Sequence, residues 1–485
     1  MRLRGVARLV GQLLGLFSLV LLVPQGVDCW YGQDEYVFLL AAMIGLALSA
    51  GAYLWGRQQD YFTVRDGFLT VTVVWVLAIF IGALPFVIGQ VLPTWTDALF
   101  EATSGLTTTG GSVSSDVSAW RPSYIVWRSL LHWLGGVGII VLLVGFIKSL
   151  GAQGGHFFYT ESSVKATGGL IPRVRQIARQ LCLAYGALTL ACILALYGAG
   201  LSLFDAINYA FSIMGEGGFA PSSEGPLVFE NNILIMWIMI IFMALAGGNF
   251  AIYAALMQRR RWRLLWSNSE MRLYGLLLMG GATLVGCGLW LSSDLALGQA
   301  FSTGAFMYVS MQVGAGFAIA DYTQWFMGLQ TILFIAMFIG GCTGSMTGGI
   351  KVSRLLILWR DMIRSLRHGA HPDLIASVRI NNQAVDQRTI DRAGQFFFLY
   401  LLIFTISTLL LTGTGLSVSD SLGLAAGALG NVGLAFGAFG PIEGFAALNT
   451  GAKIICILDM ILGRLELFTV LVLCMPSFWK SYQGK

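Results

Sequence analysis

Long apolar stretches alternate with short polar links along almost the whole chain. A transmembrane α-helix needs about 20 predominantly apolar residues in a row. The pattern predicts ten spans, at residues 8–27, 36–55, 68–92, 122–148, 181–203, 231–256, 273–293, 326–357, 394–414 and 449–475. We therefore expect an all-α polytopic membrane protein.

The composition supports this class. Of the 485 residues, 56% are hydrophobic and only 11% are charged, whereas soluble domains carry about 25% charged residues. The first span follows Arg2, Arg4 and Arg8, as the apolar region of a signal peptide would. Because the apolar run is long, lacks an Ala-x-Ala cleavage site and is followed by nine further spans, we favour an uncleaved first transmembrane helix.

Charged residues indicate the orientation of the chain. Lys and Arg are concentrated at both termini and in four links, at 57–65, 148–179, 259–272 and 351–392. The opposite links are mostly acidic, with Asp28, Asp34, Glu35, Asp97, Asp116, Glu224, Glu230, Asp294, Asp321, Asp420 and Glu443. The positive-inside rule then predicts that both termini are cytoplasmic. The same rule explains the basic run at 259–263, for which we favour topology anchoring over nucleic-acid binding.

Four short glycine-bearing segments share one spacing. Thirteen residues before Gly110, Gly218, Gly316 and Gly433 stand Asp97, Asp205, Thr303 and Asp420. This spacing leaves room for a re-entrant half-helix of about two to three turns and then an extended loop. By the charge pattern all four loops open to the outside. We expect four pseudo-repeats of helix, pore half-helix, loop and helix around a central pore, preceded by two extra N-terminal helices. The expected boundaries are 1–65 for those two helices and 66–148, 180–256, 272–360 and 393–476 for the repeats.

The loop composition suits an ion pathway. Glycine reaches positive φ without strain, so successive main-chain carbonyls can point inward and replace the hydration shell of a monovalent cation. The half-helix C-termini, each with about half a negative charge, would also favour a cation. Glycine-rich packing between helices is the alternative, and the fourfold recurrence on one side of the membrane argues against it.

The loop sequences resemble a known superfamily. The segments 104–110 (SGLTTTG), 217–219 (GGF), 315–317 (AGF) and 431–433 (NVG) are similar to the four filter signatures of the Trk/Ktr/HKT potassium transporters. The length, the two extra helices and residues 462–469 (LGRLELFT) are most similar to the bacterial Trk membrane subunit. The resemblance covers nearly the whole chain.

This resemblance implies K⁺ uptake across the bacterial cytoplasmic membrane, with K⁺ as the transported ion and no prosthetic group. It also implies a homodimer and a cytoplasmic nucleotide-binding regulatory subunit of the TrkA type, which we expect to meet the basic links 148–180, 257–272 and 351–393. The implied filter residues are Thr108, Thr109, Gly110, Gly217, Gly218, Ala315, Gly316, Asn431, Val432 and Gly433.

A second glycine cluster interrupts the span at 326–357. Five glycines stand within ten residues, namely Gly340, Gly341, Gly344, Gly348 and Gly349. Each costs about 1 kcal/mol relative to Ala in a helix, so the helix should break there. A kink is one interpretation, and the resemblance implies an intramembrane gate. It also implies that Arg464, near the middle of the last span, faces the pore as an electrostatic barrier; a snorkelling arginine is the alternative.

Some residues depart from the superfamily pattern or stand outside it. Glu216 places a carboxylate two residues before Gly218. Facing the ions, it would raise cation affinity. We favour a side chain that turns into the protein and takes a hydrogen bond, because a filter lined by carbonyls leaves side chains pointing outward. Segment 312–314 and Gly430 are also looser matches. Arg128 and His132 are expected to brace the outer ends of the loops, and Glu466 to serve packing or a salt bridge.

Other functions find little support. The seven cysteines are scattered singly and only four histidines exist, so neither a disulfide framework nor a zinc site is indicated. No pairing of nucleophile and base suggests an enzyme. Two alternatives remain open: a Na⁺-permeable or Na⁺-coupled relative, and a secondary transporter built from inverted repeats.

Overall fold

The computed structural model describes residues 3–33, 35–56, 64–149, 170–230, 232–259, 263–371, 373, 377–441 and 444–480. Within them the chain is helical apart from turns, loops and one antiparallel pair, β1 (Arg379–Ile380) and β2 (Gln383–Ala384), in which Arg379 lies opposite Ala384. The expected all-α polytopic fold is confirmed. Asp34, Glu443 and much of the basic links, including 150–169 and 260–262, lie outside the described residues.

Six helical segments in the described part are long and apolar enough to cross a membrane. They are α1–α2 (Leu3–Val20 and Leu22–Trp30), α3 (Val37–Gly56), α4 (Val64–Ile88), α9 (Leu170–Gly198), α14 (Ser269–Ser292) and α18 (Gln387–Gly413). Helices α11 (Ile233–Ala246) and α12 (Phe250–Arg259) make a seventh span if the pair, bent by 97°, counts as one.

The remaining predicted spans differ from simple apolar helices. Helix α6 (Pro122–Ser149) occupies the span at 122–148, but its first half buries polar side chains. The span at 326–357 is divided into α16 (Met327–Ile339) and α17 (Val352–Ala370) by the glycine cluster. The span at 449–475 is divided into α20 (Thr450–Arg464) and α21 (Phe468–Cys474). Glu466 and Leu467 between them have φ of 55° and 34°, which a right-handed helix cannot accommodate.

Four half-helices precede the glycine loops. They are α5 (Trp95–Leu106), α10 (Leu203–Gly215), α15 (Leu297–Val313) and α19 (Val418–Leu429). Their lengths of 12, 13, 17 and 12 residues exceed the predicted two to three turns. All four are largely buried, as polar backbone at membrane depth requires.

Three of the half-helices begin with the same cap. The side chains of Thr94, Ser202 and Ser417 accept the N–H three residues ahead, at Asp97, Asp205 and Asp420, and donate to the same residue's carboxylate at 2.7 Å. These carboxylates therefore lie at the positive helix ends, as expected. In the third repeat, the residue thirteen positions before the glycine does not mark the helix start. Thr303 lies inside α15, whose N-cap Ala296 makes no side-chain cap bond.

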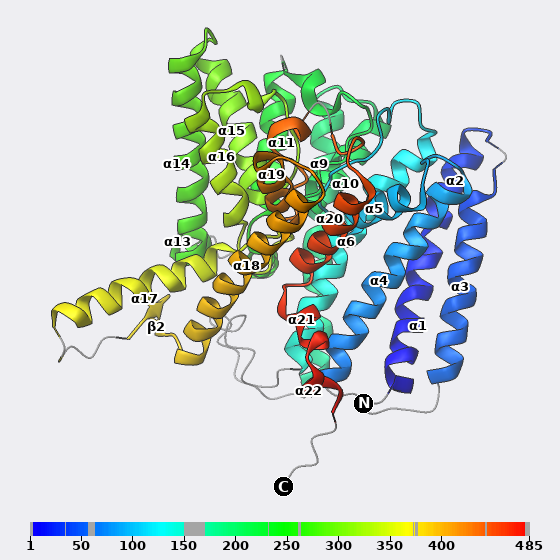
Figure 1. Cartoon of the computed structure of the whole chain (residues 1–485), viewed down its shortest axis with the longest axis horizontal. Coiled ribbons are helices and arrows are strands. Elements are labelled where there is room, and N and C mark those ends of the chain that lie inside the picture. Colours follow the sequence, from blue (N-terminus) through cyan, green and yellow to red (C-terminus); the bar gives the residue numbers. More distant parts are fainter. Residues whose placement is uncertain are drawn as a thin grey trace.

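The half-helices lie among the spans rather than around them. Figure 1 shows α5, α10, α15 and α19 in the upper half of the view, whereas α1 begins and α22 (Pro476–Trp479) ends at the lower side. α1 packs against α3 and α4, and α5 against α20. α17 and the β-hairpin project away from the bundle. Short elements complete the chain: α13 (Arg263–Ser267), η1 (Gly225–Phe229), η2 (Tyr322–Gln324) and η3 (Gly437–Phe439).

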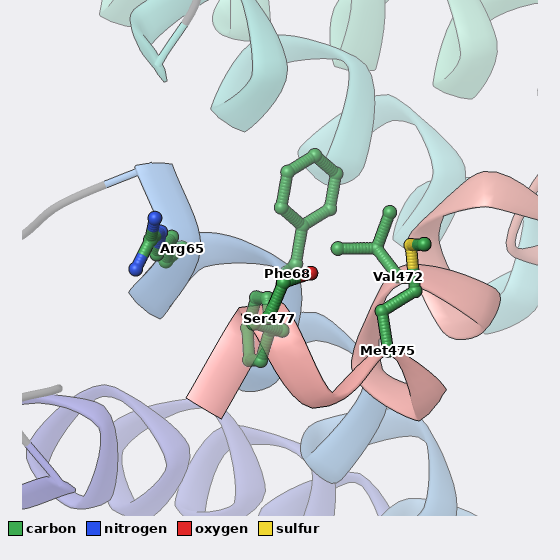
Figure 2. Close-up of a pocket in the computed structure, with 6 residues that line it drawn as sticks. Arg65, Phe68, Val472, Met475 and Ser477 are labelled. Atoms are coloured by element: carbon green, nitrogen blue, oxygen red, sulfur yellow. The ribbon is translucent and has the colours of Figure 1, made fainter. Parts of the chain in front are cut away.

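A small pocket lies at the lower end, between α4 and the last two helices (Figure 2). It is lined by Arg65, Phe68, Val472, Met475, Ser477 and Phe478. Arg65 Nη1 donates to the Lys480 carbonyl at 3.3 Å. This contact joins the last helix to α4. None of the four glycine loops lines the pocket, so the pocket is separate from the four loops.

Candidate functional site: a ring of four loops

The four loops have the same backbone conformation at two positions. Gly110, Gly218, Gly316 and Gly433 have φ of 87°, 78°, 69° and 73°. Two residues earlier, Thr108, Glu216, Gly314 and Asn431 have φ of 53°, 58°, 78° and 53°. A left-handed conformation strains a non-glycine residue by about 1–3 kcal/mol. Three of the four loops carry this strain, which persists only where the surroundings hold the conformation.

The same hydrogen bond ends every half-helix. The N–H of Thr109, Gly217, Ala315 and Val432 donates to the carbonyl five residues earlier, at distances of 2.8–2.9 Å. The acceptors are Ser104, Ser212, Ser310 and Gly427. A bond of this span together with a left-handed residue is a Schellman motif. The four half-helices therefore end in the same backbone motif although their sequences differ, and each loop leaves its helix in the same backbone conformation.

The four loops close into a ring. A Cβ atom at Gly110 would clash with the carbonyl oxygen of Gly217. One at Gly218 would lie 2.7 Å from the carbonyl oxygen of Gly316 and 2.9 Å from that of Ala315. A Cβ at Gly316 would clash with the oxygen of Val432, and one at Gly433 with the oxygen of Thr109. Each glycine thus faces the main chain of the next loop, and the fourth loop returns to the first. No side chain fits at these glycines.

The structure brings the predicted loop residues together in two layers. Eight of them form the ring itself: Thr109, Gly110, Gly217, Gly218, Ala315, Gly316, Val432 and Gly433. Thr108 and Asn431 lie behind it. The Thr108 side chain packs against Gly135, and Asn431 Oδ1 lies against Gly463. Asn431 Nδ2 donates to Thr109 Oγ1 at 3.1 Å and to the Met460 carbonyl at 2.9 Å, which ties the fourth loop to the first and to α20.

Glu216 also turns away from the ring. Its Oε1 would lie 3.2 Å from a Cβ placed on Gly247, at the break between α11 and α12. The expected direction of the side chain is therefore found. The expected hydrogen bond is not: within the described residues, neither carboxylate oxygen has a hydrogen-bond partner, although the residue is only 1% exposed.

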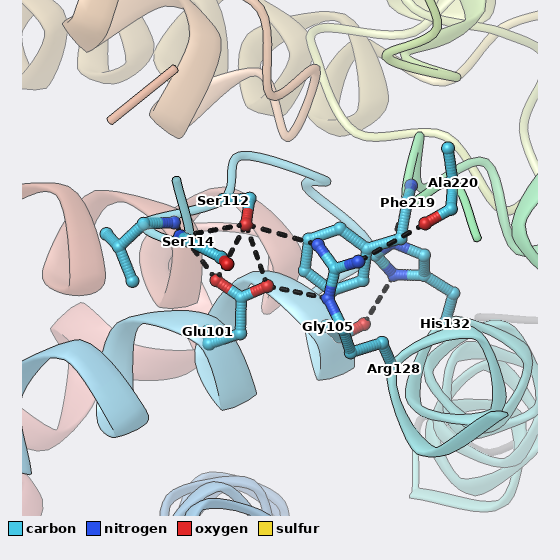
Figure 3. A network of polar contacts seen from close by, with 9 residues as sticks. Glu101, Gly105, Ser112, Ser114, Arg128, His132, Phe219 and Ala220 are labelled. Atoms are coloured by element: carbon cyan, nitrogen blue, oxygen red, sulfur yellow. Dashed lines mark hydrogen bonds and ion pairs between the residues drawn. The ribbon is translucent and has the colours of Figure 1, made fainter. Parts of the chain in front are cut away.

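A buried ion pair braces the first two loops (Figure 3). Arg128 Nε lies 2.7 Å from Glu101 Oε1, and both side chains are almost fully buried. Glu101 also accepts from Ser112 Oγ and from the Val113 N–H, at 3.0 and 3.1 Å. Arg128 reaches the second loop through the Ala220 carbonyl at 3.3 Å. One charge pair therefore holds the outer ends of both loops.

His132 joins the same two loops one turn further along α6. The Phe219 N–H donates to His132 Nε2 at 3.3 Å, so Nδ1 carries the proton of a neutral ring and donates to the Gly105 carbonyl at 2.7 Å. The expectation that Arg128 and His132 brace the loops agrees with these contacts. Glu101 was missed, although an acidic residue inside an apolar half-helix signals a buried partner.

The glycine cluster forms an irregular segment, residues 340–351, which we call the intramembrane loop. Gly340, Gly344 and Gly349 have positive φ, of 73°, 82° and 71°. Gly341 and Gly348 permit close contact: a Cβ at Gly341 would meet the Gly247 carbonyl, and one at Gly348 would meet the Gly430 carbonyl. The intramembrane loop therefore packs against the α11–α12 break and against the end of α19.

The second repeat and α14 hold the intramembrane loop in place. The Cys342 N–H donates to the Gly247 carbonyl at 2.8 Å, and the Thr343 N–H donates to Glu270 Oε1 at 2.5 Å. The Met346 side chain is buried in an apolar cluster with Tyr185, Met214 and Phe250 among others. These contacts tie the intramembrane loop to the second repeat and to α14.

Arg464 fastens the tip of the intramembrane loop from the fourth repeat. Its Nη1 donates to the Met346 carbonyl at 2.5 Å, and the residue is 2% exposed. It is the last residue of α20 and not the middle of a continuous span. The helix ends there, so Glu466 lies in the break between α20 and α21.

Glu466 makes the expected salt bridge instead. Its carboxylate lies 2.8 Å from Arg354 Nη2 and 3.6 Å from Lys351 Nζ. Lys351 and Arg354 stand where the intramembrane loop enters α17. The break between α20 and α21 is therefore tied to the end of the intramembrane loop, directly beside Arg464.

Known proteins resemble this chain in sequence and in fold. The model of the TrkH family, described as cation transport protein, matches residues 35–481. The chain belongs to the TrkH family. The family is one of transporters, and together with the apolar helices it makes this chain a membrane protein.

Relatives align over nearly the full length. The Trk system potassium uptake protein TrkH of Salmonella typhimurium is 34% identical, over 99% of this chain and all of its own. The protein TrkG of Escherichia coli is 33% identical over 99% of both chains. The crystal structure of the potassium transporter TrkH from Vibrio parahaemolyticus covers 99% of this chain and all of its own, with a TM-score of 0.91 and 31% identity. The expected membership in the Trk group is confirmed.

Proposed function

We propose that this protein takes up K⁺ through the ring of four loops. The main support is the closed ring of contacts between successive loops. Gly110 contacts the second loop, each following glycine contacts the next loop, and Gly433 contacts the first. Four equivalent backbones would present main-chain carbonyls to one axis, where they could replace the water of a monovalent cation. Relatives named potassium uptake proteins support K⁺ as the ion.

The proposed filter consists of the ten residues predicted from the sequence. The ring carbonyls, including those of Thr109, Gly217, Ala315 and Val432, would contact the ion, because these are the atoms that the glycines of neighbouring loops face. Thr108 and Asn431 would hold the ring from behind. The half-helix ends direct partial negative charge toward the same region, which favours a cation over an anion.

The proposed gate consists of the intramembrane loop and Arg464. The five glycines of the loop give its backbone the freedom to rearrange, and its contacts with Gly247, Glu270 and Arg464 would be exchanged when it moves. A positive charge beneath a cation filter raises the electrostatic barrier while the gate is shut. Movement of the loop would then open the path.

The cellular arrangement belongs to the same proposal. We place the protein in the bacterial cytoplasmic membrane because its relatives are bacterial Trk potassium uptake proteins. The charge pattern supports an orientation with both termini inside. The boundaries predicted from the sequence, 66–148, 180–256, 272–360 and 393–476, remain part of the proposal. A homodimer and a nucleotide-binding regulatory subunit of the TrkA type would complete the system, with the basic links as the docking region.

Growth and ion uptake test the proposal. A bacterial strain lacking its own K⁺ uptake systems should grow at low K⁺ when it expresses this protein, and it should take up Rb⁺ in preference to Na⁺. Equal or faster Na⁺ uptake would favour the Na⁺-permeable alternative. That alternative draws on Glu216, the carboxylate directly behind the second loop.

A further inference from the structure

Two buried opposite charges lie close to the intramembrane loop without forming an ion pair. Glu216, at the end of α10, is 1% exposed and has no hydrogen-bond partner within the described residues. Arg464 uses Nη1 for the Met346 carbonyl, whereas its Nε and Nη2 have no partner in the same part of the chain. Burying unpaired charges is strongly unfavourable. An ion pair between Glu216 and Arg464 would therefore stabilise both groups, and this conformation does not form it.

A series of contacts through the intramembrane loop connects Glu216 with Arg464. Glu216 Oε1 lies against Gly247, whose carbonyl accepts the Cys342 N–H at 2.8 Å. The Ser345 N–H donates to the Cys342 carbonyl at 3.1 Å, and the next residue, Met346, is the one that Arg464 holds.

We propose that Glu216 is the second partner of Arg464, taken when the intramembrane loop withdraws. This inference rests on the proposed function, in which that loop is the gate. Withdrawal removes the Met346 carbonyl from Arg464 and leaves the guanidinium facing a carboxylate that can accept two parallel N–H bonds. The ion pair would cancel the positive barrier beneath the ring at the moment the path opens.

The position of Glu216 separates this role from a role in ion selection. Its side chain points toward Gly247 behind the second loop, while the ring is made of main-chain carbonyls. Loss of the carboxylate should therefore change how often the path is open and leave the preference between cations as it was.

Rb⁺ influx into lipid vesicles containing the full-length protein tests the inference. We expect Glu216→Gln to lower influx about fivefold, the lower end of ordinary coupling between two sites. Arg464→Ala should raise influx, because the substitution removes both the hydrogen bond to the Met346 carbonyl and the positive charge beneath the ring. In the Arg464→Ala background, Glu216→Gln should have no further effect. Glu216→Ala carries the same expectations and replaces the Gln variant where that variant does not assemble.

Asp459→Asn is the matched control. Asp459 is a buried carboxylate on the same helix as Arg464, and it accepts the Ser407 hydroxyl at 2.6 Å. Its loss should leave Rb⁺ influx and the effect of Arg464→Ala unchanged.

Three results would overturn the inference. These are unchanged or increased influx in Glu216→Gln, an equal reduction in the presence and absence of Arg464, and an altered ratio of Rb⁺ to Na⁺ influx. Absence of Rb⁺ influx in the unmodified protein would instead contradict the proposed function, so the two failures can be told apart.

Discussion

Lys453 Nζ lies 2.7 Å from Asp97 Oδ1 and joins the first turn of the first half-helix to the first turn of α20, 356 residues further along the chain. Both side chains are nearly buried. Lys453 also donates to the Ala446 carbonyl at 3.2 Å. The contact links the first and fourth repeats on the side of the ring where the half-helices begin.

Breaking this pair should destabilise the protein. Lys453→Met leaves the Asp97 carboxylate buried without its cation, and the loss of one partner of a buried pair costs about 3–5 kcal/mol. Thermal unfolding of the purified protein measures the effect. Arg121→Met is the control, because the Arg121–Glu35 pair is about 40% exposed on each side and should contribute only about 0–1 kcal/mol. Similar losses of stability in both variants would show that the Lys453–Asp97 pair contributes no more than an exposed ion pair.

Gly110→Ser should reduce discrimination between K⁺ and Na⁺. Gly110 has φ of 87°, and a side chain there would clash with the Gly217 carbonyl, so the ring must widen or distort. A distortion worth about 1.4 kcal/mol would change the ratio of Rb⁺ to Na⁺ influx about tenfold.

Gly200→Ser is the matched variant for this experiment. Gly200 has φ of 103° and nothing within 4 Å of its Cβ position, so it shares the backbone strain without the contact. The ratio of Rb⁺ to Na⁺ influx should stay the same there. An unchanged ratio in Gly110→Ser would remove this glycine from the filter.

Glu270→Gln should loosen the intramembrane loop. The Glu270 carboxylate accepts the Thr343 N–H at 2.5 Å, and a charge-assisted bond is roughly twice as strong as a neutral one. A loss of about 1 kcal/mol should raise basal Rb⁺ influx about fivefold and leave selectivity unchanged. Asp294→Asn, an exposed acid just past the other end of α14, should have no effect. Lower influx in Glu270→Gln would mean that the tether holds the path open.

His132→Phe should weaken the link between the first two loops. The substitution keeps an aromatic ring near Phe219, whose centroid lies 4.3 Å from the imidazole, but removes the bonds to the Gly105 carbonyl and the Phe219 N–H. Leaving buried polar groups unpaired costs about 1–3 kcal/mol each. We expect a lower unfolding temperature and a smaller ratio of Rb⁺ to Na⁺ influx. A variant with an unaltered ratio would restrict His132 to stability alone.

The sequence predicted the loops well because their spacing reflects helix length. The aspartates at 97, 205 and 420 mark true helix starts, since a hydroxyl cap and an acidic residue three positions on is a local signal. Thr303 misled because the third half-helix lacks that cap and begins six residues earlier. Counting backward from a glycine cannot reveal where a longer helix starts.

Contacts across the bundle could not be predicted in the same way. The partner of Glu101 is 27 residues away and that of Asp97 is 356 residues away, so no periodicity connects them. The five glycines indicated where the helix breaks, but not that Gly247, Glu270 and Arg464 would hold the resulting loop. Those partners depend on how the repeats close around the axis.

A structure with bound Rb⁺ located by anomalous scattering would show directly whether main-chain oxygens of the four loops bind the transported cation. We expect a peak inside the ring, within contact distance of the carbonyl oxygens of Thr109, Gly217, Ala315 and Val432. A ring without an ion at saturating Rb⁺, or a peak held instead by the Glu216 carboxylate, would contradict it.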